Sequence, residues 1–346
     1  MKNIHWFLLI SLLLTLSTYS VAVTSSHHRT PLNEQFSIAT YPVDLSGVNI
    51  AVYEGYTSDL CTNSRMALYN MFTWMNATVD YLNSSQIYKN DEIWDYDILA
   101  IPDGLAPRFE TRLGILGLDV IRDWVSKGGI YFGVRAGATL ACAYSYFEGT
   151  NEEYHLKLFN GTGYGPLVEL DDMCITDVNI NTSALPSFSN APADLDVLYR
   201  LSRYFEAAEG QDVIPIGHYD ANDGLGMLAF HYGTGCGFIT GLDPEFEENS
   251  DRDGTDFRDE FDDPDSEWPL MLDICRWMVS ESYWNLTTTP IITPSTTSTE
   301  TTSTTSMITT ESTSEIVSQF PMMLVGTSSI AIVAVVAIIV FIRLKK

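Results

Sequence analysis

The sequence predicts an α/β fold with three layers, in which helices cover both faces of a mostly parallel, flavodoxin-like sheet. Three observations predict it: apolar runs of strand length, segments between them with apolar residues at helical spacing, and a stretch from residue 45 to 285 that can hold one large core. Strands that alternate with helices at this spacing are typical of parallel sheets. A stalk and one transmembrane helix are expected to follow the domain.

The first half of the domain supplies the alternation. Residues 47–53 form a mainly apolar run that is followed by a glutamate and a glycine, and residues 60–75 carry apolar side chains at helical spacing. A second helix, 116–126, is amphipathic and is stopped by a lysine and two glycines. The other elements expected in this half are strands at 77–82, 96–102 and 128–134 and a helix at 138–144.

The second half is richer in strands. Apolar runs at 213–219, 227–231 and 237–240 predict three of them, and residues 232–235 (Tyr-Gly-Thr-Gly) predict a hairpin turn between the last two. An amphipathic helix at 270–279 closes the domain.

Both ends of the chain indicate membrane targeting. Residues 1–23 combine a lysine, an apolar run and small residues, as a secretory signal peptide does, and 24–44 is a linker. Residues 286–318 include 21 serines or threonines, a composition typical of an O-glycosylated stalk. An uncharged segment at 319–342 is long enough to cross a bilayer, and the basic residues at 343–346 place that end in the cytosol. The sequence predicts a single-pass type I protein of the cell membrane with its domain outside the cell.

Composition narrows the partners of this domain. The net charge is −27, and a phosphate backbone would repel so acidic a chain, which excludes nucleic acid as a partner. Five cysteines in an exported domain predict two disulfides and one buried thiol. Five N-glycosylation sequons agree with export, at Asn76, Asn83, Asn160, Asn181 and Asn285.

An apolar strand at 128–134 runs into a tight turn of small residues that opens a helix. Such an elbow holds one side chain over the carboxyl edge of a sheet, beside backbone N–H groups. A serine or cysteine at that place would be a nucleophile, but the residue here is Arg135. A guanidinium keeps its proton at any relevant pH and cannot attack a carbonyl group.

The order of elements over residues 45–280 resembles the class I glutamine amidotransferase-like fold, and most of all the branch related to the N-terminal domain of biotin–protein ligase. Apart from the strand order, the resemblance rests on four short motifs, Gly133–Ala138, Gly165–Pro166, Tyr204–Glu206 and Gly241–Glu245. It implies a catalytic cysteine at the elbow, with a histidine and a glutamate from a later His-x-Glu motif.

This chain departs from that pattern at the catalytic positions. The cysteine position is Arg135, the histidine position is Asp243, and only the carboxylate Glu245 is kept. Asp103, next to Gly104, stands where the family usually has a glycine that lends an amide to the oxyanion hole. The resemblance therefore implies a degenerate triad without thiol-dependent amide hydrolysis.

The exchanged residues carry opposite charges, which predicts an internal contact. We expect Arg135 to pair with Asp243, with Glu245 as a second acceptor, because charges in a semi-buried site need partners. The alternative is that Arg135 faces solvent or an anionic ligand.

Apart from Arg135, the side chains expected in the crevice at the carboxyl ends of the strands are weaker candidates for catalytic groups. Ligands bind at the carboxyl ends of the strands in open α/β sheets, so residues 54–61, which include Cys61, should lie beside Gly104. Cys142 is expected two helical turns into the elbow helix and buried, and Cys61 is expected in a disulfide. His218 and His231 are expected to be ordinary strand histidines without an acidic or serine partner.

Residues 243–267 hold 13 carboxylates in 25 residues. The set Asn249, Asp251, Asp253 and Glu260 follows the register of a calcium-binding loop, with a glycine at the sixth position. The first position is Asn and no clear helix leads in, so a solvated acidic loop without metal is the alternative. Calcium is the one cofactor that the sequence suggests.

The lost triad, the stalk and the anchor favour a membrane-anchored, catalytically inactive domain that binds an unidentified ligand or protein partner outside the cell. Two alternatives remain. One is an enzyme with non-thiol, metal-assisted hydrolytic chemistry in the same crevice, and the other is a structural coat protein of the cell surface.

Overall fold

The computed structural model describes residues 43–188, 190–248, 250–263 and 265–282. The chain divides into two units, Met1–Pro290 and Ile291–Lys346, and every described residue belongs to the first. The predicted signal peptide, stalk, transmembrane segment and basic tail lie outside the described residues, as do most of the linker, Asn249 and Asn285. Within the described ranges, no helix is long and apolar enough to cross a membrane.

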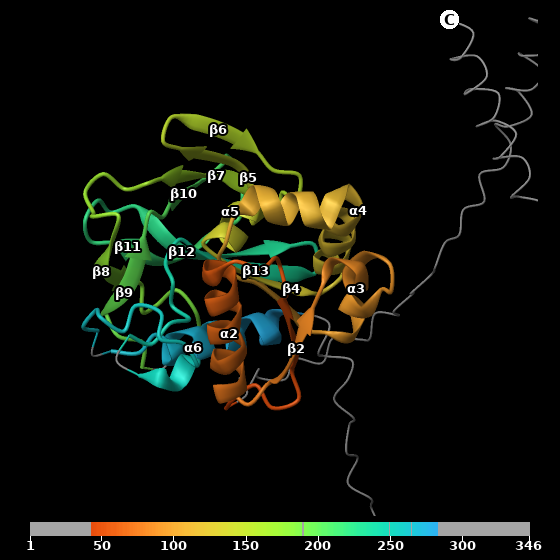
Figure 1. The fold of residues 1–346 in the computed structure, drawn as a ribbon, viewed down its shortest axis with the longest axis horizontal. Helices are drawn as coiled ribbons and strands as arrows, with labels where there is room; N and C mark the ends of the chain where they lie inside the picture. Colours follow the sequence, from red (N-terminus) through yellow and green to blue (C-terminus); the bar gives the residue numbers. More distant parts are fainter. Residues whose placement is uncertain (1–42, 189, 249, 264, 283–346) are drawn as a thin grey trace, which may run out of the picture. The chain divides into compact units, whose positions relative to one another are not determined.

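A nine-stranded sheet forms the centre of the domain (Figure 1). From one edge to the other its strands are β2 (Thr78–Leu82), β1 (Asn49–Tyr53), β3 (Ile98–Ile101), β4 (Ile130–Val134), β13 (Gly235–Thr240), β12 (Leu225–Tyr232), β11 (Ile214–Tyr219), β8 (Met173–Ile180) and β9 (Asp194–Arg200). The first five strands are parallel to one another, and every pairing from β13 to β9 is antiparallel.

The sheet is therefore mixed, which corrects the prediction of a mostly parallel one. The reason is the short connection between successive strands of the second half, since a hairpin turn can only join antiparallel neighbours. Gly233 and Thr234 connect β12 to β13 in this way, as the sequence predicts. The parallel half has the expected character, because all residues of β3 and β4 are buried, as in sheets that are covered on both faces.

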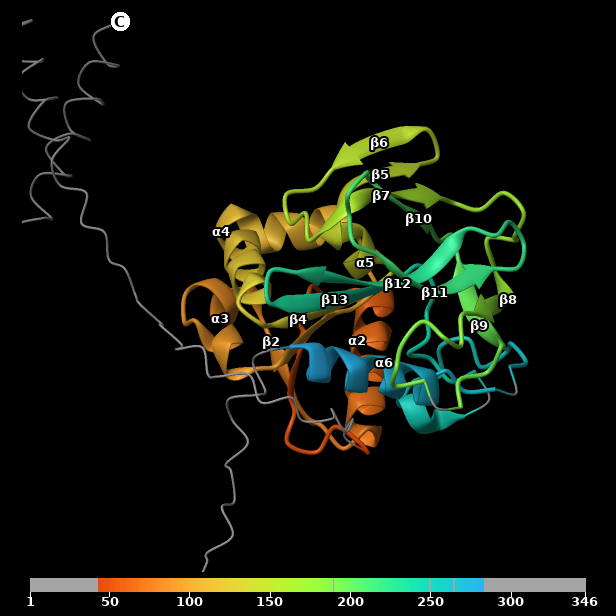
Figure 2. The same ribbon diagram turned by 180° about the vertical axis from the view of Figure 1, so that it is seen from behind.

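Helices cover both faces of the sheet, as predicted. Leu68, Met71 and Phe72 of α2 (Asp59–Trp74) join one core cluster with the buried side chains of α6 (Trp268–Glu281). The buried apolar side chains of α3 (Ser84–Tyr88), α4 (Ala106–Ser126) and α5 (Ala136–Ala141) join the other. Both views place α2 and α6 on the side of the sheet opposite to α4 and α5 (Figures 1 and 2). Two short 3-10 helices, η2 (Glu92–Asp95) and η3 (Asp251–Asp253), lie in connecting segments.

Two helices differ from the prediction. Helix α4 begins ten residues earlier than expected, and Gly114 interrupts it with a φ of 62°. Glycine adopts this conformation without a steric penalty, so the chain bends there and continues as a helix. Helix α5 ends at Ala141, and Cys142 is the first residue of a strand, not part of the elbow helix.

A second sheet of four strands was not predicted. Its order is β10 (Tyr204–Ala207), β7 (Phe159–Gly165), β5 (Cys142–Phe147) and β6 (Thr150–Glu153), and β6 forms its outer edge (Figure 2). Three tyrosines lie directly opposite one another across three strands, and ring contacts join Tyr146 to Tyr164 and Tyr164 to Tyr204. Strand β6 is polar and β7 is glycine-rich, so both carry little apolar periodicity, and the first residues of β5 were expected to continue the elbow helix.

All five cysteines are free thiols, so the predicted disulfides are wrong. Four of them are fully buried and pack as small apolar side chains on different elements: Cys61, Cys142, Cys236 and Cys275. Of the predicted glycosylation sites, Asn76, Asn160 and Asn181 are exposed, whereas Asn83 caps α3 with its side chain and is partly buried.

A pair of like charges across β8 and β9 gives a pH-dependent prediction. Asp177 and Asp196 are cross-strand partners, and a hydrogen bond between their carboxyls, together with burial, raises the pKa of Asp196 to about 6. The folded protein therefore binds this proton more tightly than the unfolded chain does, and the resulting stability, complete below about pH 4, is lost as the pH rises through 6.

The variant Asp177→Asn should reduce this loss, because an amide at 177 donates to the ionised Asp196. We expect the variant to melt higher than the wild type at pH 7.5 and to match it at pH 4. Asp177 is exposed, so screening keeps the gain below about 1 kcal/mol. Equal differences at both pH values, measured by thermal melting, would contradict a shared proton.

Candidate functional site

The elbow between β4 and α5 sets the position of Arg135. This residue has a φ of 43° and a ψ of −94°, a conformation that is rare for a residue with a side chain. Its N–H donates to the carbonyl of Thr240 at 2.8 Å, and its own carbonyl accepts from the N–H of Thr139 at 2.8 Å. The backbone thus keeps the geometry that presents a nucleophile in a strand–elbow–helix, although the side chain is an arginine.

Small residues allow α5 to approach the sheet closely. A Cβ on Gly137 would overlap the carbonyl oxygen of Ile101 on β3, and one on Gly133 would lie 2.7 Å from the ring of Tyr131. The hydroxyl of Tyr131 donates to the carbonyl of Gly137 at 2.7 Å, which ties the helix to the strand. The glycines at these positions therefore serve the backbone approach that the elbow requires.

The Arg135 side chain turns inward to two carboxylates. Its Nη1 lies 3.2 Å from Asp103 Oδ2 and 3.3 Å from Asp243 Oδ2. The guanidinium side chain is 10% exposed and the two acidic side chains 2% and 0%, so the pairs are almost completely removed from water. The structure thus contains the expected Arg135–Asp243 contact and adds Asp103 as the second acceptor.

A second arginine, which the sequence did not indicate, completes the group. Arg200 ends β9, and its Nη2 bonds Asp103 Oδ2 and lies 3.5 Å from Asp243 Oδ1. Two buried arginines therefore face two buried aspartates; we call Arg135, Arg200, Asp103 and Asp243 the four-charge cluster. The only sequence signal for Arg200 is that a charged residue ends an apolar run. Nothing in the sequence indicates that this strand lies near the elbow.

A carboxylate of the cluster also accepts a hydrogen bond from the backbone amide that would otherwise stabilise an oxyanion. The N–H of Ala136, the residue after the elbow position, donates to Asp103 Oδ1 at 3.3 Å. In an active acyl-transfer site this amide donates to the developing negative charge on the substrate oxygen. Here a carboxylate of the protein itself accepts from it, so a substrate carbonyl would have to displace Asp103.

Glu245 lies deeper and has a different partner from the one expected. Its Oε1 accepts from the hydroxyl of Ser64 at 2.6 Å, and that hydroxyl accepts from the N–H of Asp103 at 2.9 Å. Burial and the nearby charge of Asp243 raise the pKa of Glu245 well above its usual value. The retained carboxylate therefore supports the Asp103 turn through Ser64 and is not a hydrogen-bond acceptor of Arg135.

The acidic neighbours stabilise the charge of Arg135. Burial alone would lower the pKa of Arg135, but Asp103, Asp243 and Glu245 outweigh it and raise that pKa above the ordinary value. Burial raises the pKa of Asp243, and the two arginines oppose this rise. The protonated guanidinium is the stable form of Arg135, which excludes it as a nucleophile or a general base.

Sequence comparison assigns the family. Residues 48–265 match the family model described as biotin–protein ligase, N-terminal. The chain belongs to the biotin–protein ligase N-terminal family. This membership fits the class I glutamine amidotransferase-like superfamily that the motifs resemble. A comparison with curated proteins found no match.

The solved structures that are similar to this chain have low sequence identity to it. A protein described as ThuA-like from Bacteroides uniformis is 12% identical over 72% of this chain and 97% of its own, with a TM-score of 0.47. A protein described as a GMP synthase component from Thermoplasma acidophilum is 10% identical over 58% of this chain and 85% of its own, with a TM-score of 0.39. At this distance we draw no functional argument from either.

The remaining crevice residues of this family member are not reactive groups. Gly104 is needed where it lies, because a Cβ there would be 2.8 Å from the ring of Phe109. Cys61 is fully buried in the first turn of α2, and burial raises the pKa of its thiol. Burial also raises the pKa of Cys142 to about 12. Both cysteines are therefore thiols at neutral pH and poor nucleophiles.

The two strand histidines do have acidic neighbours, contrary to expectation. His231 Nδ1 lies 2.6 Å from Asp212 Oδ2 and its Nε2 lies 3.7 Å from Glu281 Oε2. His218 Nδ1 lies 3.9 Å from Asp223 Oδ1 and 3.0 Å from the backbone carbonyl oxygen of the same residue. Loops and a helix end supply these partners, so strand patterns alone did not reveal them.

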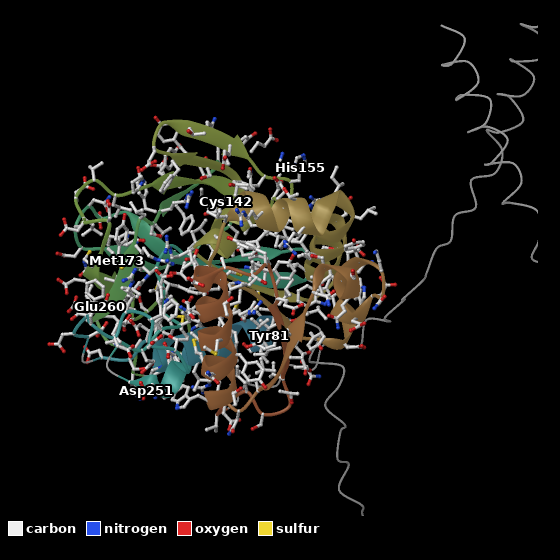
Figure 3. All side chains as sticks on the ribbon, viewed as in Figure 1. Tyr81, Cys142, His155, Met173, Asp251 and Glu260 are labelled. Carbon is white, nitrogen blue, oxygen red and sulfur yellow. The ribbon has the colours of Figure 1, made fainter. Side chains whose placement is uncertain are left out.

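The predicted calcium loop is arranged differently. Asp253 is buried, and its carboxylate accepts from the N–H groups of Thr255 at 2.8 Å and Glu247 at 3.3 Å. Asp251 and Glu260 are exposed at the margin of the domain, and Glu260 pairs with Arg258 at 2.9 Å (Figure 3). The structure does not bring these three carboxylates together, because loop amides and an arginine satisfy two of them.

Proposed function

We propose that this chain is a non-catalytic member of its family, a pseudoenzyme whose domain binds a ligand or a protein partner. The observation that carries the proposal is the four-charge cluster. The position that would hold the nucleophile carries a guanidinium, and Asp103 and Asp243 contact it at 3.2 and 3.3 Å. Such an arrangement stabilises a closed site and offers no group that could form a covalent intermediate.

The cluster also argues against the alternative of metal-assisted hydrolysis in the same crevice. That chemistry would need Asp103, Asp243 or Glu245 as ligands with free oxygen lone pairs. Asp103 and Asp243 each contact two arginines, and Glu245 accepts from the Ser64 hydroxyl with Oε1, so only its Oε2 lacks a hydrogen-bond partner among the oxygens of these three carboxylates. A cation at this place would also meet the positive charges of Arg135 and Arg200.

The proposed location is the outer face of a cell membrane. It rests on the sequence of the two chain ends and on three exposed sequon asparagines, Asn76, Asn160 and Asn181. In this arrangement the domain stands away from the bilayer on its Ser/Thr-rich stalk. A coat protein of the cell surface would share these features, but it gives no reason for a preserved elbow.

A hydrolysis assay tests the proposal. We expect the purified full-length chain to give no turnover of glutamine, small amides, peptides or esters above the rate without protein. The comparison is the triple variant Asp103→Gly/Arg135→Cys/Asp243→His, which restores the family pattern beside Glu245. Turnover by the wild type that Glu245→Gln abolishes would contradict the proposal, because that variant keeps the shape of the site and changes only its chemistry.

A further inference from the structure

Three carboxyl groups of the acidic segment converge, and none of them belongs to the four-charge cluster. Glu248 lies in the segment after β13, Asp263 lies in the loop, and Glu267 is the residue before α6. One oxygen from each lies within 4.8 Å of the others, and no other such group of three potential metal ligands occurs in the described ranges. None of the three belongs to the loop register that the sequence suggested.

These carboxyl groups are buried to an extent unusual for acidic residues. Glu267 is 0% exposed, and Glu248 and Asp263 are each 2% exposed. Acidic side chains are almost never fully buried unless they are paired or hold a metal ion. Their location therefore needs a compensating charge or proton.

Hydrogen bonds within the protein do not supply that compensation to the two glutamates. Both carboxylate oxygens of Glu248 and both of Glu267 are buried without a hydrogen-bond partner. The helix that follows Glu267 does not use its side chain as a cap. The oxygens of both glutamates thus have free lone pairs, and one oxygen of each glutamate lies close to an oxygen of Asp263, which is how carboxylates gather around a cation.

The surroundings are acidic as well. The three groups repel one another, and the other charges that act on them belong to Asp243, Glu247, Asp196 and Asp265. Arg252 is close in sequence but pairs with Glu247 at 2.5 Å and lies over the ring of Trp268 at 4.2 Å. With burial, this environment raises the pKa of Glu248 to about 8 and that of Asp263 to about 6.

We propose that Glu248, Asp263 and Glu267 bind one calcium ion. Carboxylate oxygens select hard cations, and three carboxylates can supply up to about six oxygens to a calcium ion. Two oxygens bound to one calcium ion are at most about 4.6–5.2 Å apart, and the three oxygens, all within 4.8 Å of one another, fit this limit. Magnesium binds at shorter distances and keeps several waters, which a buried site of this kind does not favour.

The ion would connect three parts of the chain. It would join the segment that carries Asp243 and Glu245 to the acidic loop and to the start of α6. The ring of Phe257, in the same loop, packs against the ring of Phe246. The guanidinium of Arg200 lies over the Phe257 ring, 5.2 Å from the centre of that ring. Calcium binding would therefore fix the loop that covers one side of the four-charge cluster.

Thermal melting of the full-length chain tests this site, first with a chelator and then with calcium. We expect calcium at millimolar concentration to raise the Tm by about 5 °C, and magnesium at the same concentration to raise it less. Glu267→Gln and Glu248→Gln should each lose the calcium-dependent rise. Without calcium they should melt at or above the wild type, because each replaces a buried carboxyl group with a neutral amide of nearly the same size.

Two exposed carboxylates of the sequence-predicted loop provide matched controls. Asp251→Asn and Glu260→Gln remove the same charge and should keep the full calcium-dependent rise. Terbium luminescence excited through Trp268, the neighbour of Glu267, gives a direct reading of binding even if one glutamate variant folds poorly. An unchanged wild-type Tm with no terbium signal would overturn the proposal. A rise that is lost in Asp251→Asn and kept in Glu267→Gln would also overturn it.

Discussion

Replacing Arg135 with methionine is expected to lower the free energy of unfolding by about 3–5 kcal/mol, which corresponds to a fall in Tm on the order of 10 °C. The methionine fills a similar volume but leaves Asp103 and Asp243 with Arg200 as their only guanidinium partner. Both carboxylates are almost fully buried, so water cannot replace the lost charge. Urea unfolding of the full-length chain, followed by tryptophan fluorescence, measures the effect.

A surface ion pair provides the control for that measurement. Lys127 pairs with Asp123 at 2.8 Å, and both side chains are about half exposed. Lys127→Met should change the free energy of unfolding by less than about 1 kcal/mol. If the two variants lost the same stability, Arg135 would not be part of a buried charge cluster.

Gly137→Ala should destabilise the protein by about 3 kcal/mol, although alanine is the better helix former by about 1 kcal/mol. Gly137 lies within α5, where helix propensity alone would predict a gain in stability. The added methyl group would overlap the backbone oxygen of Ile101, which cannot move without breaking the β3–β4 pairing. The sign of the measured change in the free energy of unfolding separates the steric effect from the effect of helix propensity.

A glycine of α4 is the matched comparison. A Cβ on Gly117 would meet the Cβ of Leu113 at 3.2 Å, a contact that a shift of a few tenths of an ångström relieves. Gly117→Ala should therefore change stability by about 1 kcal/mol or less in either direction. A stabilising effect of Gly137→Ala in the same urea assay would mean that the elbow does not need its close approach to the sheet.

The sequence predicted the parallel half of the fold well because that half is coded locally. Residues 60–75 and 116–126 carry apolar side chains at helical spacing, and the structure has helices there. Strands β3 and β4 are continuous apolar runs, as buried parallel strands are. The second sheet escaped prediction because strands such as β6, with the sequence Thr-Asn-Glu-Glu, are exposed and have no apolar pattern.

The candidate site was predictable where it depended on one motif and unpredictable where it depended on tertiary contacts. The elbow and its Arg135 followed from local residues, and the contact with Asp243 followed from opposite charges at matched positions. Arg200 enters from β9, an antiparallel strand whose position no local pattern fixes. The hydroxyl of Ser64, in the second turn of α2, bonds Glu245, a contact that only the packed structure reveals.

Tertiary contacts, which the sequence does not reveal, also decide which carboxyl groups of the acidic loop lie together. Spacing along the chain suggested Asp251, Asp253 and Glu260 as neighbours, but backbone amides satisfy Asp253 and an arginine satisfies Glu260. The carboxyl groups that do converge come from positions 248, 263 and 267, which are too far apart in sequence for a short-loop register. Burial, not spacing, distinguishes them from the other acidic residues of the segment.

The most direct test of the four-charge cluster is a double-mutant cycle between Arg135 and Asp243. Urea unfolding is measured for the wild type, Arg135→Met, Asp243→Asn and the double variant. A buried pair at 3.3 Å predicts a coupling free energy of about 2 kcal/mol or more, so that the double variant is much more stable than the sum of the single losses implies. A coupling below about 0.5 kcal/mol would contradict the account, because the two side chains would then act independently and the elbow would not be closed by an internal ion pair.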